Sequence, residues 1–470
     1  MCALKQRRRW SSIWSVCREA IGGTDRDFTQ EPLKRAMFLL AVPMVLEMMM
    51  ESIFAVVDMF FVSRLGAEAV ATVGITEALM TIVYAIGGGL ATATTAIVSR
   101  RIGEGDHVKA SSAGMQAIYS GLLVSLAIAV PGMMYAGDIL EAMGGTSVMV
   151  NEMSGYASLL LGGNVVIMLL FIINAIFRSS GDAAISMRVL FLANLINIVL
   201  DPLFIFGIGP IEGMGVKGAA VATTTGRGIA VLYQLYILFK GKRRICPGMK
   251  QLAPDLNQMA LLMKLALGGI GQSIITTSSW ILLMRIIAGF GSSVVAGYTI
   301  AIRVIVFSLL PSVGLSNAAS TLVGQNLGAG KPERAQKAVY ITAMVNMIMM
   351  GLISILFITT PMTFIRLFAG DGALALQAQN SLRVISYGFV FYGLGMVMTQ
   401  TLNGAGDTFT PTLINLFCFW ALEIPLAWYL SKHTGLQESG VYYAITIAES
   451  IMALIGLAVF RKGRWKLQKV

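Results

Sequence analysis

The chain has 470 residues, of which 56% are hydrophobic and 13% are charged, and its mean hydropathy is +0.75. Soluble domains carry about 25% charged residues, so this composition excludes a water-soluble globular protein and favours lipid as the solvent of the long apolar segments. The formal net charge is +11, but the basic residues gather in the tails and short connections, as in cytoplasmic loops of membrane proteins. This distribution argues against nucleic-acid binding.

Apolar segments long enough to cross a bilayer recur along the whole chain. About 20 residues are needed for one crossing as a helix. The segments are 34–62, 68–98, 110–135, 152–177, 184–207, 216–240, 259–289, 294–322, 335–362, 382–402, 410–430 and 439–460. The sequence therefore predicts an all-α integral membrane protein with about twelve transmembrane helices.

Twelve crossings place both termini on one side, and the basic tails predict that this side is the cytoplasm. The expected organisation is a basic tail, a lobe of six helices, a linker, a second lobe of six helices and a second tail, over residues 1–30, 31–240, 241–256, 257–460 and 461–470. We expect a multi-pass, monomeric protein of the inner (plasma) membrane.

One constant shift in residue number, the one that carries Gly66 onto Gly291, aligns the connections of the first half with those of the second. We call it the half-to-half shift. Leu65-Gly66 then falls on Phe290-Gly291, and Gly181-Asp182 falls on Gly406-Asp407. Gly103 likewise falls on Gly328. Six helices per half leave both halves in the same orientation, so an axis along the membrane normal relates them, an arrangement found in secondary transporters.

The first predicted helix contains three acidic residues, Glu47, Glu51 and Asp58. At 100° per residue they lie within about 40° of one another on one helix face. A charge within the bilayer costs about 2.5–3.5 kcal/mol on insertion scales, so this face is expected to line a water-filled cavity or, for Glu47 and Glu51, to lie near an interface. Pro43 precedes them and permits a kink, which makes it a candidate hinge.

A second polar group lies at the same predicted depth as Asp58. Asn197 and Asp201 share a face of the fifth helix because they are four residues apart, and Thr223 and Tyr156 enter at a similar level. Such an oxygen-rich set suits a proton or a hard cation, with Na⁺ as the candidate metal at Asp58, Asn197, Asp201 and Thr223. A hydrogen-bonded structural cluster is the alternative interpretation.

The second half does not repeat this group. Leu283 stands at the position that matches Asp58, and Leu426 at the position that matches Asp201. The remaining intramembrane acids there are Glu423 and Glu449, for which we consider a role in the cavity or a pairing with Arg285 or Arg303. The ion-coupling chemistry is therefore predicted in one half only.

Enzyme signatures are missing from the sequence. There is no P-loop, HExxH or GxSxG motif, and the four cysteines form no CxxC pair. We expect no catalytic residues and no cofactor other than a coupling ion.

Several short segments of the chain are specific in combination. They are Val57-Asp58, Phe61-Val62-Ser63-Arg64-Leu65-Gly66, Arg178-Ser179-Ser180-Gly181-Asp182, Asn197-Ile198-Val199-Leu200-Asp201-Pro202, Val323-Gly324-Gln325-Asn326-Leu327-Gly328-Ala329-Gly330 and Asn403-Gly404-Ala405-Gly406-Asp407. With these segments, the chain resembles the multidrug and toxic compound extrusion (MATE) family of transporters over about residues 30–460.

The resemblance implies a two-lobed antiporter that exports drugs or metabolites, cationic or amphipathic in character, against inward H⁺ or Na⁺. Residues that match the amino-terminal-lobe site of the DinF-like and archaeal members are Asp58, Tyr156, Asn174, Asn197, Asp201 and Thr223. The chain departs from the sodium-coupled NorM-type pattern, since the seventh helix has Gln272 and Trp280 but no carboxylate. A lipid or lipid-linked oligosaccharide flippase of the same superfamily is the alternative function.

Overall fold

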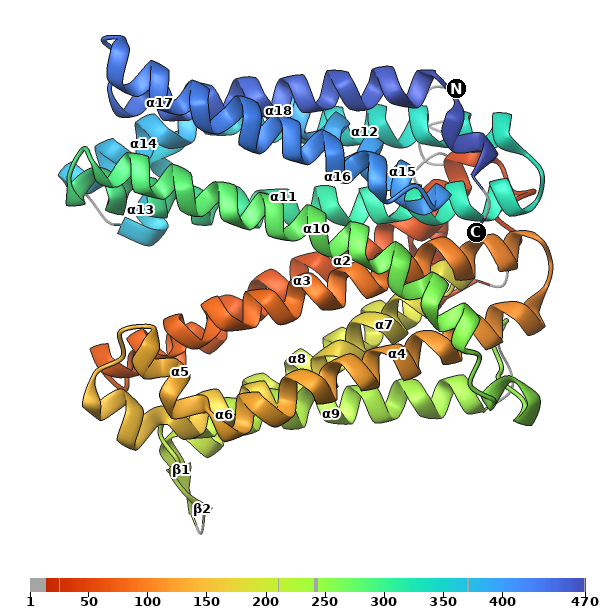
Figure 1. The fold of residues 1–470 in the computed structure, drawn as a ribbon, viewed down its shortest axis with the longest axis horizontal. Helices are drawn as coiled ribbons and strands as arrows, with labels where there is room; N and C mark the ends of the chain where they lie inside the picture. Colours follow the sequence, from red (N-terminus) through yellow and green to blue (C-terminus); the bar gives the residue numbers. More distant parts are fainter. Residues whose placement is uncertain (1–13, 25, 210, 241–243, 370–371, 469) are drawn as a thin grey trace, which may run out of the picture.

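The computed structural model describes residues 14–24, 26–209, 211–240, 244–369, 372–468 and 470. Helices dominate the fold, and they form two halves that diverge toward one end of the molecule and meet at the other (Figure 1). Within the described residues, ten helices are long and apolar enough to cross a membrane, or eleven if one bent pair counts as a single span. The more polar α9 (Val216–Phe239) completes twelve.

The first half contains six spans and a short hairpin at the open end. Its helices are α2 (Leu33–Ser63), α3 (Ala67–Gly103), α4 (His107–Met134), α5 (Ala136–Ala142), α6 (Ser154–Gly162), α7 (Asn164–Ser180), α8 (Ala183–Phe206) and α9. A π-helical turn (Met149–Met153) precedes α6. Between α8 and α9, β1 (Gly207–Ile208) pairs antiparallel with β2 (Ile211–Glu212), with Ile208 opposite Ile211.

The second half repeats this order of helices. They are α10 (Leu256–Ala288), α11 (Ser292–Gly328), α12 (Pro332–Thr359), α13 (Pro361–Ala369), α14 (Ala373–Ser386), α15 (Phe389–Ala405), α16 (Phe409–Asn415), α17 (Ile424–His433) and α18 (Glu438–Arg461). A π-helical segment (Leu416–Glu423) joins α16 to α17, so the three make one span.

The predicted repeat is visible in the helix bounds. α3 and α11 begin and end at positions related by the half-to-half shift, and so do α4 and α12. α7 and α15 both end at a glycine in the left-handed region, Gly181 at φ 100° and Gly406 at φ 94°. A glycine adopts this conformation without the steric cost that a Cβ would add, which explains why the connections align in sequence.

The tenth predicted span differs in form from the sequence expectation. It is not a straight helix over 382–402, because α14 and α15 are bent by 56° at the break that precedes Phe389. Gly388 immediately precedes α15, and Gly163 occupies the matching place between α6 and α7. The hydropathy pattern extends through such breaks because the side chains on both sides are apolar, so it does not reveal them.

The first helix of each half begins against the opposite half. Met37, Leu40 and Met44 of α2 share a buried cluster with Leu315 and Leu322 of α11. Conversely, Leu262 and Ala266 of α10 belong to the cluster of the first half. A Cβ on Gly314 would lie 2.7 Å from the Met44 carbonyl oxygen, and a Cβ on Gly269 would lie 2.9 Å from the Gly89 Cα. Close helix crossings therefore tie the halves together.

A symmetric contact closes the molecule at the end opposite the opening. A Cβ on Gly103 would lie 2.0 Å from the Gln325 carbonyl oxygen, and a Cβ on Gly328 would lie 2.1 Å from the Arg100 carbonyl oxygen. These four residues exchange places under the half-to-half shift. The ends of α3 and α11 thus meet on the axis that relates the halves, at a distance that only glycine permits.

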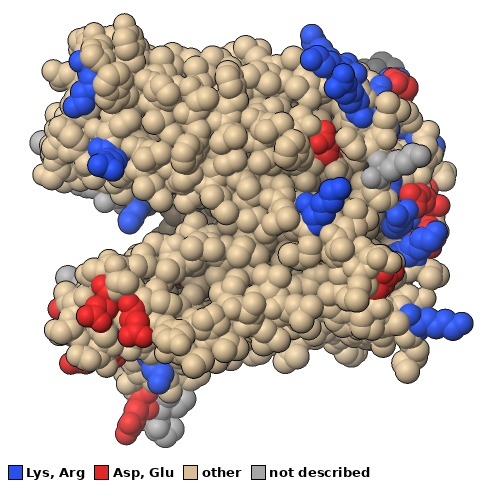
Figure 2. All heavy atoms as spheres, viewed as in Figure 1, with Lys and Arg blue, Asp and Glu red and all other residues tan. Residues whose placement is uncertain are grey.

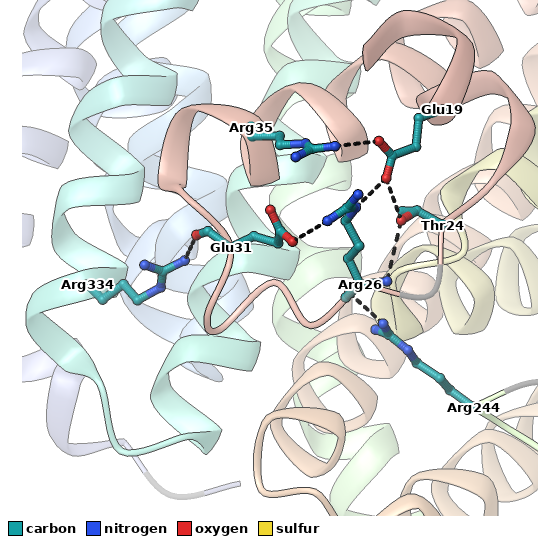
Figure 3. Close-up of polar contacts among 7 residues, drawn as sticks. All are labelled: Glu19, Thr24, Arg26, Glu31, Arg35, Arg244 and Arg334. Atoms are coloured by element: carbon teal, nitrogen blue, oxygen red, sulfur yellow. Dashed lines mark hydrogen bonds and ion pairs between the residues drawn. The ribbon is translucent and has the colours of Figure 1, made fainter. Parts of the chain in front are cut away.

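The chain termini reinforce this closed end. Residues 14–31, apart from residue 25, form a segment that we call the N-terminal strap; it is helical over 14–22. Figure 3 shows Arg26 of the strap between the carboxylates of Glu19 and Glu31, and it also shows Arg35 beside Glu19. Residues 1–13, the rest of the predicted tail, lie outside the described residues.

The strap joins the two halves. The linker residue Arg244 donates to the Arg26 carbonyl, while Arg334 of α12 donates to the Glu31 carbonyl (Figure 3). Lys331 donates to the Thr29 carbonyl at 3.0 Å. At the C-terminus, Arg101 of α3 donates to the Val470 carbonyl at 2.7 Å. Contacts from both termini thus cross between the halves at the closed end.

Candidate functional site

A cavity of about 400 Å³ lies between the two halves. Figure 2 shows the molecule hollowed between the halves at the end away from the termini. We call the cavity of about 400 Å³ the central cavity. Its polar lining from the first half is Glu47, Glu51, Thr92, Thr95, Asn174, Arg178 and Arg227, and that from the second half is Gln272, Ser273, Asn317, Ser320, Thr321, Gln400 and Asn403.

The central cavity has lining residues at equivalent positions of both halves. Thr92 and Asn317 are one such pair, and Thr95 and Ser320 are another. The charges of its described lining, however, come from the first half alone. They are two glutamates and two arginines, so this wall is formally neutral when all four are ionised. The sequence predicted the two acids but neither arginine.

Glu47 and Arg178 form the first ion pair, at 2.9 Å between Oε1 and Nη1, and the Glu47 side chain is almost wholly buried. The equivalent residues of the second half are Gln272 and Asn403. Their amides donate to each other, at 3.0 and 3.1 Å. The same link between the first and fourth spans is therefore charged in one half and neutral in the other, which identifies it as part of the scaffold.

Glu51 and Arg227 form the second ion pair, at 3.1 Å between Oε1 and Nη2. The Arg227 side chain is buried and lies over the Phe54 ring, 5.2 Å from its centroid. Thr276 stands at the position equivalent to Glu51, so the second half cannot repeat this ion pair. The Glu51 Oε2 atom is buried without a hydrogen-bond partner among the described residues.

Three of the predicted ion-site residues lie in direct contact near the open end. In the amide orientation that satisfies its neighbours, Asn197 donates to Asp201 Oδ2 at 2.7 Å and accepts from the Thr223 hydroxyl at 3.1 Å. Asp201 is fully buried and Asn197 is nearly so. The i, i+4 spacing on α8 and the packing of α9 against it place these groups together.

Asp58 and Tyr156 lie close to this trio. The charges of Asp58 and Asp201 interact, and Tyr156 is near both carboxylates. The Asp58 Oδ1 atom is buried and has no hydrogen-bond partner in the described part of the chain. A buried polar atom without a partner costs about 1–3 kcal/mol, so this carboxylate is suited to accept a proton or a cation.

Glu77 and Tyr84 of α3 belong to the same electrostatic network, although the sequence analysis did not single them out. Asp58 interacts with Glu77 and with Arg227, and Tyr84 lies beside the Arg227 guanidinium. The sequence pattern that could have identified them is an acidic and an aromatic residue two helical turns apart on the second predicted helix. It is weaker than the three acids that share one face of the first helix.

Two predicted residues lie apart from the ion-site group. Asn174 lines the central cavity and accepts from Gln234 at 2.6 Å; it is in the inner part of α7, too far along the helix to reach Asp58. Glu423 does not line the cavity as the described residues define it. It is buried, and its Oε2 accepts from Ser279 at 2.8 Å, rather than pairing with Arg285 or Arg303.

Pro43 is buried within α2, which continues as a helix on both sides of it. The residue lies where α2 leaves the second half and approaches the central cavity. Leu283, which matches Asp58, is buried in the apolar core of the second half, and Leu426 packs against that core.

Comparison with known proteins places these features in one family. The MatE family model matches residues 43–203 and 270–429, one segment in each half. The probable multidrug resistance protein YoeA of Bacillus subtilis is 25% identical, with 93% of this chain and 95% of that protein covered. The FAD transporter of Shewanella oneidensis is also 25% identical, over 90% and 93%.

Solved structures show the same fold. The crystal structure of MATE in complex with MaL6 matches with a TM-score of 0.88 at 23% identity, covering 94% of this chain and 99% of that one. An outward-facing conformation of a multidrug resistance MATE family transporter of the MOP superfamily also has a TM-score of 0.88, at 23% identity, over 94% and 98%. Since the family model spans most of both halves, the chain belongs to the MATE family of membrane transporters.

Proposed function

We propose that this protein is a plasma-membrane antiporter that exports small organic molecules in exchange for inward-moving H⁺ or Na⁺. The single observation that carries the proposal is an asymmetry. In one half, the half-buried Asp58 interacts with the fully buried Asp201, and the Oδ1 atom of Asp58 is covered without a hydrogen-bond partner among the described residues, beside a cavity that both halves line. An ion and a substrate can thus occupy neighbouring places in one molecule.

The orientation follows from the distribution of basic residues. Arg100, Arg101, Arg244, Lys331 and Arg334 lie at the closed end, and cytoplasmic loops carry an excess of Lys and Arg. With the closed end in the cytoplasm, both termini are cytoplasmic and the central cavity opens outward. An inward-moving cation then gains about 2.3 kcal/mol per charge per 100 mV of potential.

The branch of the family is inferred from the residues. Gln272 and Trp280 stand in the seventh span without a carboxylate, which supports the DinF-like or archaeal type, although the relatives include the probable multidrug resistance protein NorM of Thermotoga maritima at 24% identity. The named full-length relatives include drug-resistance proteins, and none of these names supports the flippase alternative.

Efflux from proteoliposomes tests the proposal. Ethidium is loaded, and a pH gradient and a Na⁺ gradient are imposed separately, so the gradient that drives efflux identifies the coupling ion. We expect Asp58→Asn and Asp201→Asn each to abolish gradient-driven efflux. Glu152→Gln, an exposed acid near the open end, is the control and is expected to retain it. Full gradient-driven efflux by Asp58→Asn would refute the assigned ion site.

A further inference from the structure

The two ion pairs of the central cavity have different relations to the internal repeat. Glu47–Arg178 has a neutral counterpart in Gln272–Asn403, which makes the same link between spans. Glu51–Arg227 has none, since Thr276 replaces the acid. The second half folds without an ion pair at this position, so the pair is not required for the fold of a half. Glu51–Arg227 is therefore a feature specific to the first half, as is the group around Asp58.

Arg227 connects the cavity to the ion site. Its guanidinium pairs with Glu51 at 3.1 Å on the cavity side. It also interacts electrostatically with Asp58 of α2 and with Glu77 and Tyr84 of α3. Within the described residues, it is the one cation that both Glu51 and Asp58 share. Because Arg227 is buried, its surroundings screen its attraction to these acids less than water would.

The pair leaves two polar atoms without a partner. The Glu51 Oε2 and Arg227 Nε atoms are both covered and make no hydrogen bond among the described residues. The rest of the Glu51 side chain is accessible, since it is 36% exposed and lines the central cavity. A cationic group in the cavity can therefore reach the Glu51 carboxylate, and a small rotation of that side chain would turn its unpartnered oxygen toward the ligand, while Arg227 competes for the same carboxylate.

We propose that Arg227 is a movable countercharge through which ion binding at Asp58 and cation binding at Glu51 weaken each other. The inference rests on the proposed antiport function and names the cationic class of its substrates. With Asp58 ionised, Arg227 is attracted toward Asp58 and Glu77, and Glu51 is available to a cationic substrate. When an ion neutralises Asp58, that attraction weakens, Arg227 holds Glu51 more closely, and the substrate is released.

Such competition is a coupling free energy between two sites, and it must act equally in both directions. Couplings in proteins typically change affinity by about 5- to 150-fold. The geometry makes Arg227 a positioning residue rather than a ligand of either the ion or the substrate. Its removal should therefore reduce the ratio between the substrate affinity without the ion and the substrate affinity with the ion, and substrate binding itself should persist.

The test measures binding of tetraphenylphosphonium to the purified full chain in detergent, with and without saturating Na⁺, and at low and high pH. In the native chain we expect the ion to weaken binding by about 5-fold or more. In Arg227→Gln we expect binding to persist, and we expect the ratio of the dissociation constants with and without the ion to fall to nearly one. In Glu51→Gln we expect binding to weaken in both conditions. Arg178→Gln is the matched comparison, and its two affinities should change in parallel.

The outcomes separate the inference from the function on which it rests. If Asp58→Asn keeps the native ion effect, the ion site of the proposed function is wrong. If Asp58→Asn loses the effect and Arg227→Gln keeps it, only the countercharge is wrong. If Arg227→Gln cannot be obtained folded, the double variant Glu51→Gln/Arg227→Gln removes both charges; a native ion effect on its remaining binding would also overturn the inference.

Discussion

Substitution of Gly328 by alanine tests whether the crossing of α3 and α11 controls which end of the transporter is open. The added Cβ would lie 2.1 Å from the Arg100 carbonyl oxygen, whereas ordinary van der Waals contacts of a Cβ begin at 3.4 Å. The two helix ends must therefore move apart until this contact reaches its ordinary length. The obstacle is backbone on both sides, so a change of rotamer cannot remove it.

Overpacking of this kind costs about 1–3 kcal/mol. In the proposed antiport cycle the two helix ends separate when this end opens, so the cost applies only while it is shut. The equilibrium should therefore shift by about 5- to 150-fold toward the state that opens at the termini. Since the crossing is symmetric, Gly103→Ala should produce a shift in the same direction.

Spin labels on the connections 104–106 and 329–331 measure this shift as a distance distribution across the closed end. We expect Gly328→Ala to increase the population at long distance in lipid. Gly74→Ala is the control, since the same change in α3 meets no atom within 4 Å. A distribution in Gly328→Ala that matches the native one would show that the crossing does not hold this end shut.

Two further predictions concern the closed end and the scaffold pair. Partial burial alone would raise the pKa of Glu19, but hydrogen bonds from Arg26 and Arg35 lower this pKa below its usual 4.5. The pKa of Glu19 is thus lower in the folded chain than in the unfolded one. The strap should therefore keep its stability above about pH 4.5 and lose it as the pH falls through the lowered pKa. Desolvation alone would raise the pKa of Asp27, but hydrogen bonds from Thr29 and Gln30 and the charge of Arg244 together lower it, so Asp27 should act in the same direction. Hydrogen exchange of residues 14–31 across a pH series, with Glu19→Gln as control, measures this, and protection unchanged to well below pH 4 would contradict it. In the neutral pair of the second half, Gln272→Glu alone leaves a buried charge without a cation and should destabilise the protein by about 3–5 kcal/mol. The double variant Gln272→Glu/Asn403→Arg copies the first-half pair and should recover most of this lost stability, as measured by thermal unfolding. If the double variant is no more stable than the single one, the two pairs are not equivalent.

The sequence was sufficient for the architecture because the signals are long and repeated. Apolar segments long enough to cross a bilayer and glycines that recur at one shift predicted the spans and the two halves, and the helix bounds agree within several residues outside the tenth span, where α14 begins at Ala373. The breaks before Asn164 and Phe389 were not predicted, since a broken helix can be as apolar as a straight one. The packing of the first parts of α2 and α10 against the opposite half was not predicted either, because hydropathy carries no information on which helices pack together.

The acids of the candidate site except Glu77 were selected from the sequence, but neither of its two arginines was. Helix periodicity placed Glu47, Glu51 and Asp58 on one face, and the i, i+4 spacing joined Asn197 to Asp201. Arg178 and Arg227 come from other helices, and Arg178 is near a helix end where a basic residue is ordinary. Their pairing with Glu47 and Glu51 depends on tertiary contacts, which a single sequence does not reveal. The roles proposed for these residues stay predictions.

The packing of α2 against α11 has a consequence for how the protein is made. α2 ends at Ser63 and α11 begins at Ser292, so nearly half of the chain is synthesised between them. At about 5–20 residues per second, α2 waits roughly 10 to 50 s for its partner. During that time the buried face of Met37, Leu40 and Met44 is presented to lipid or to the insertion machinery. A ribosome that stalls after the first half would therefore leave a nascent chain with one helix unmatched, recognisable to quality control before the contact between α3 and α11 has formed.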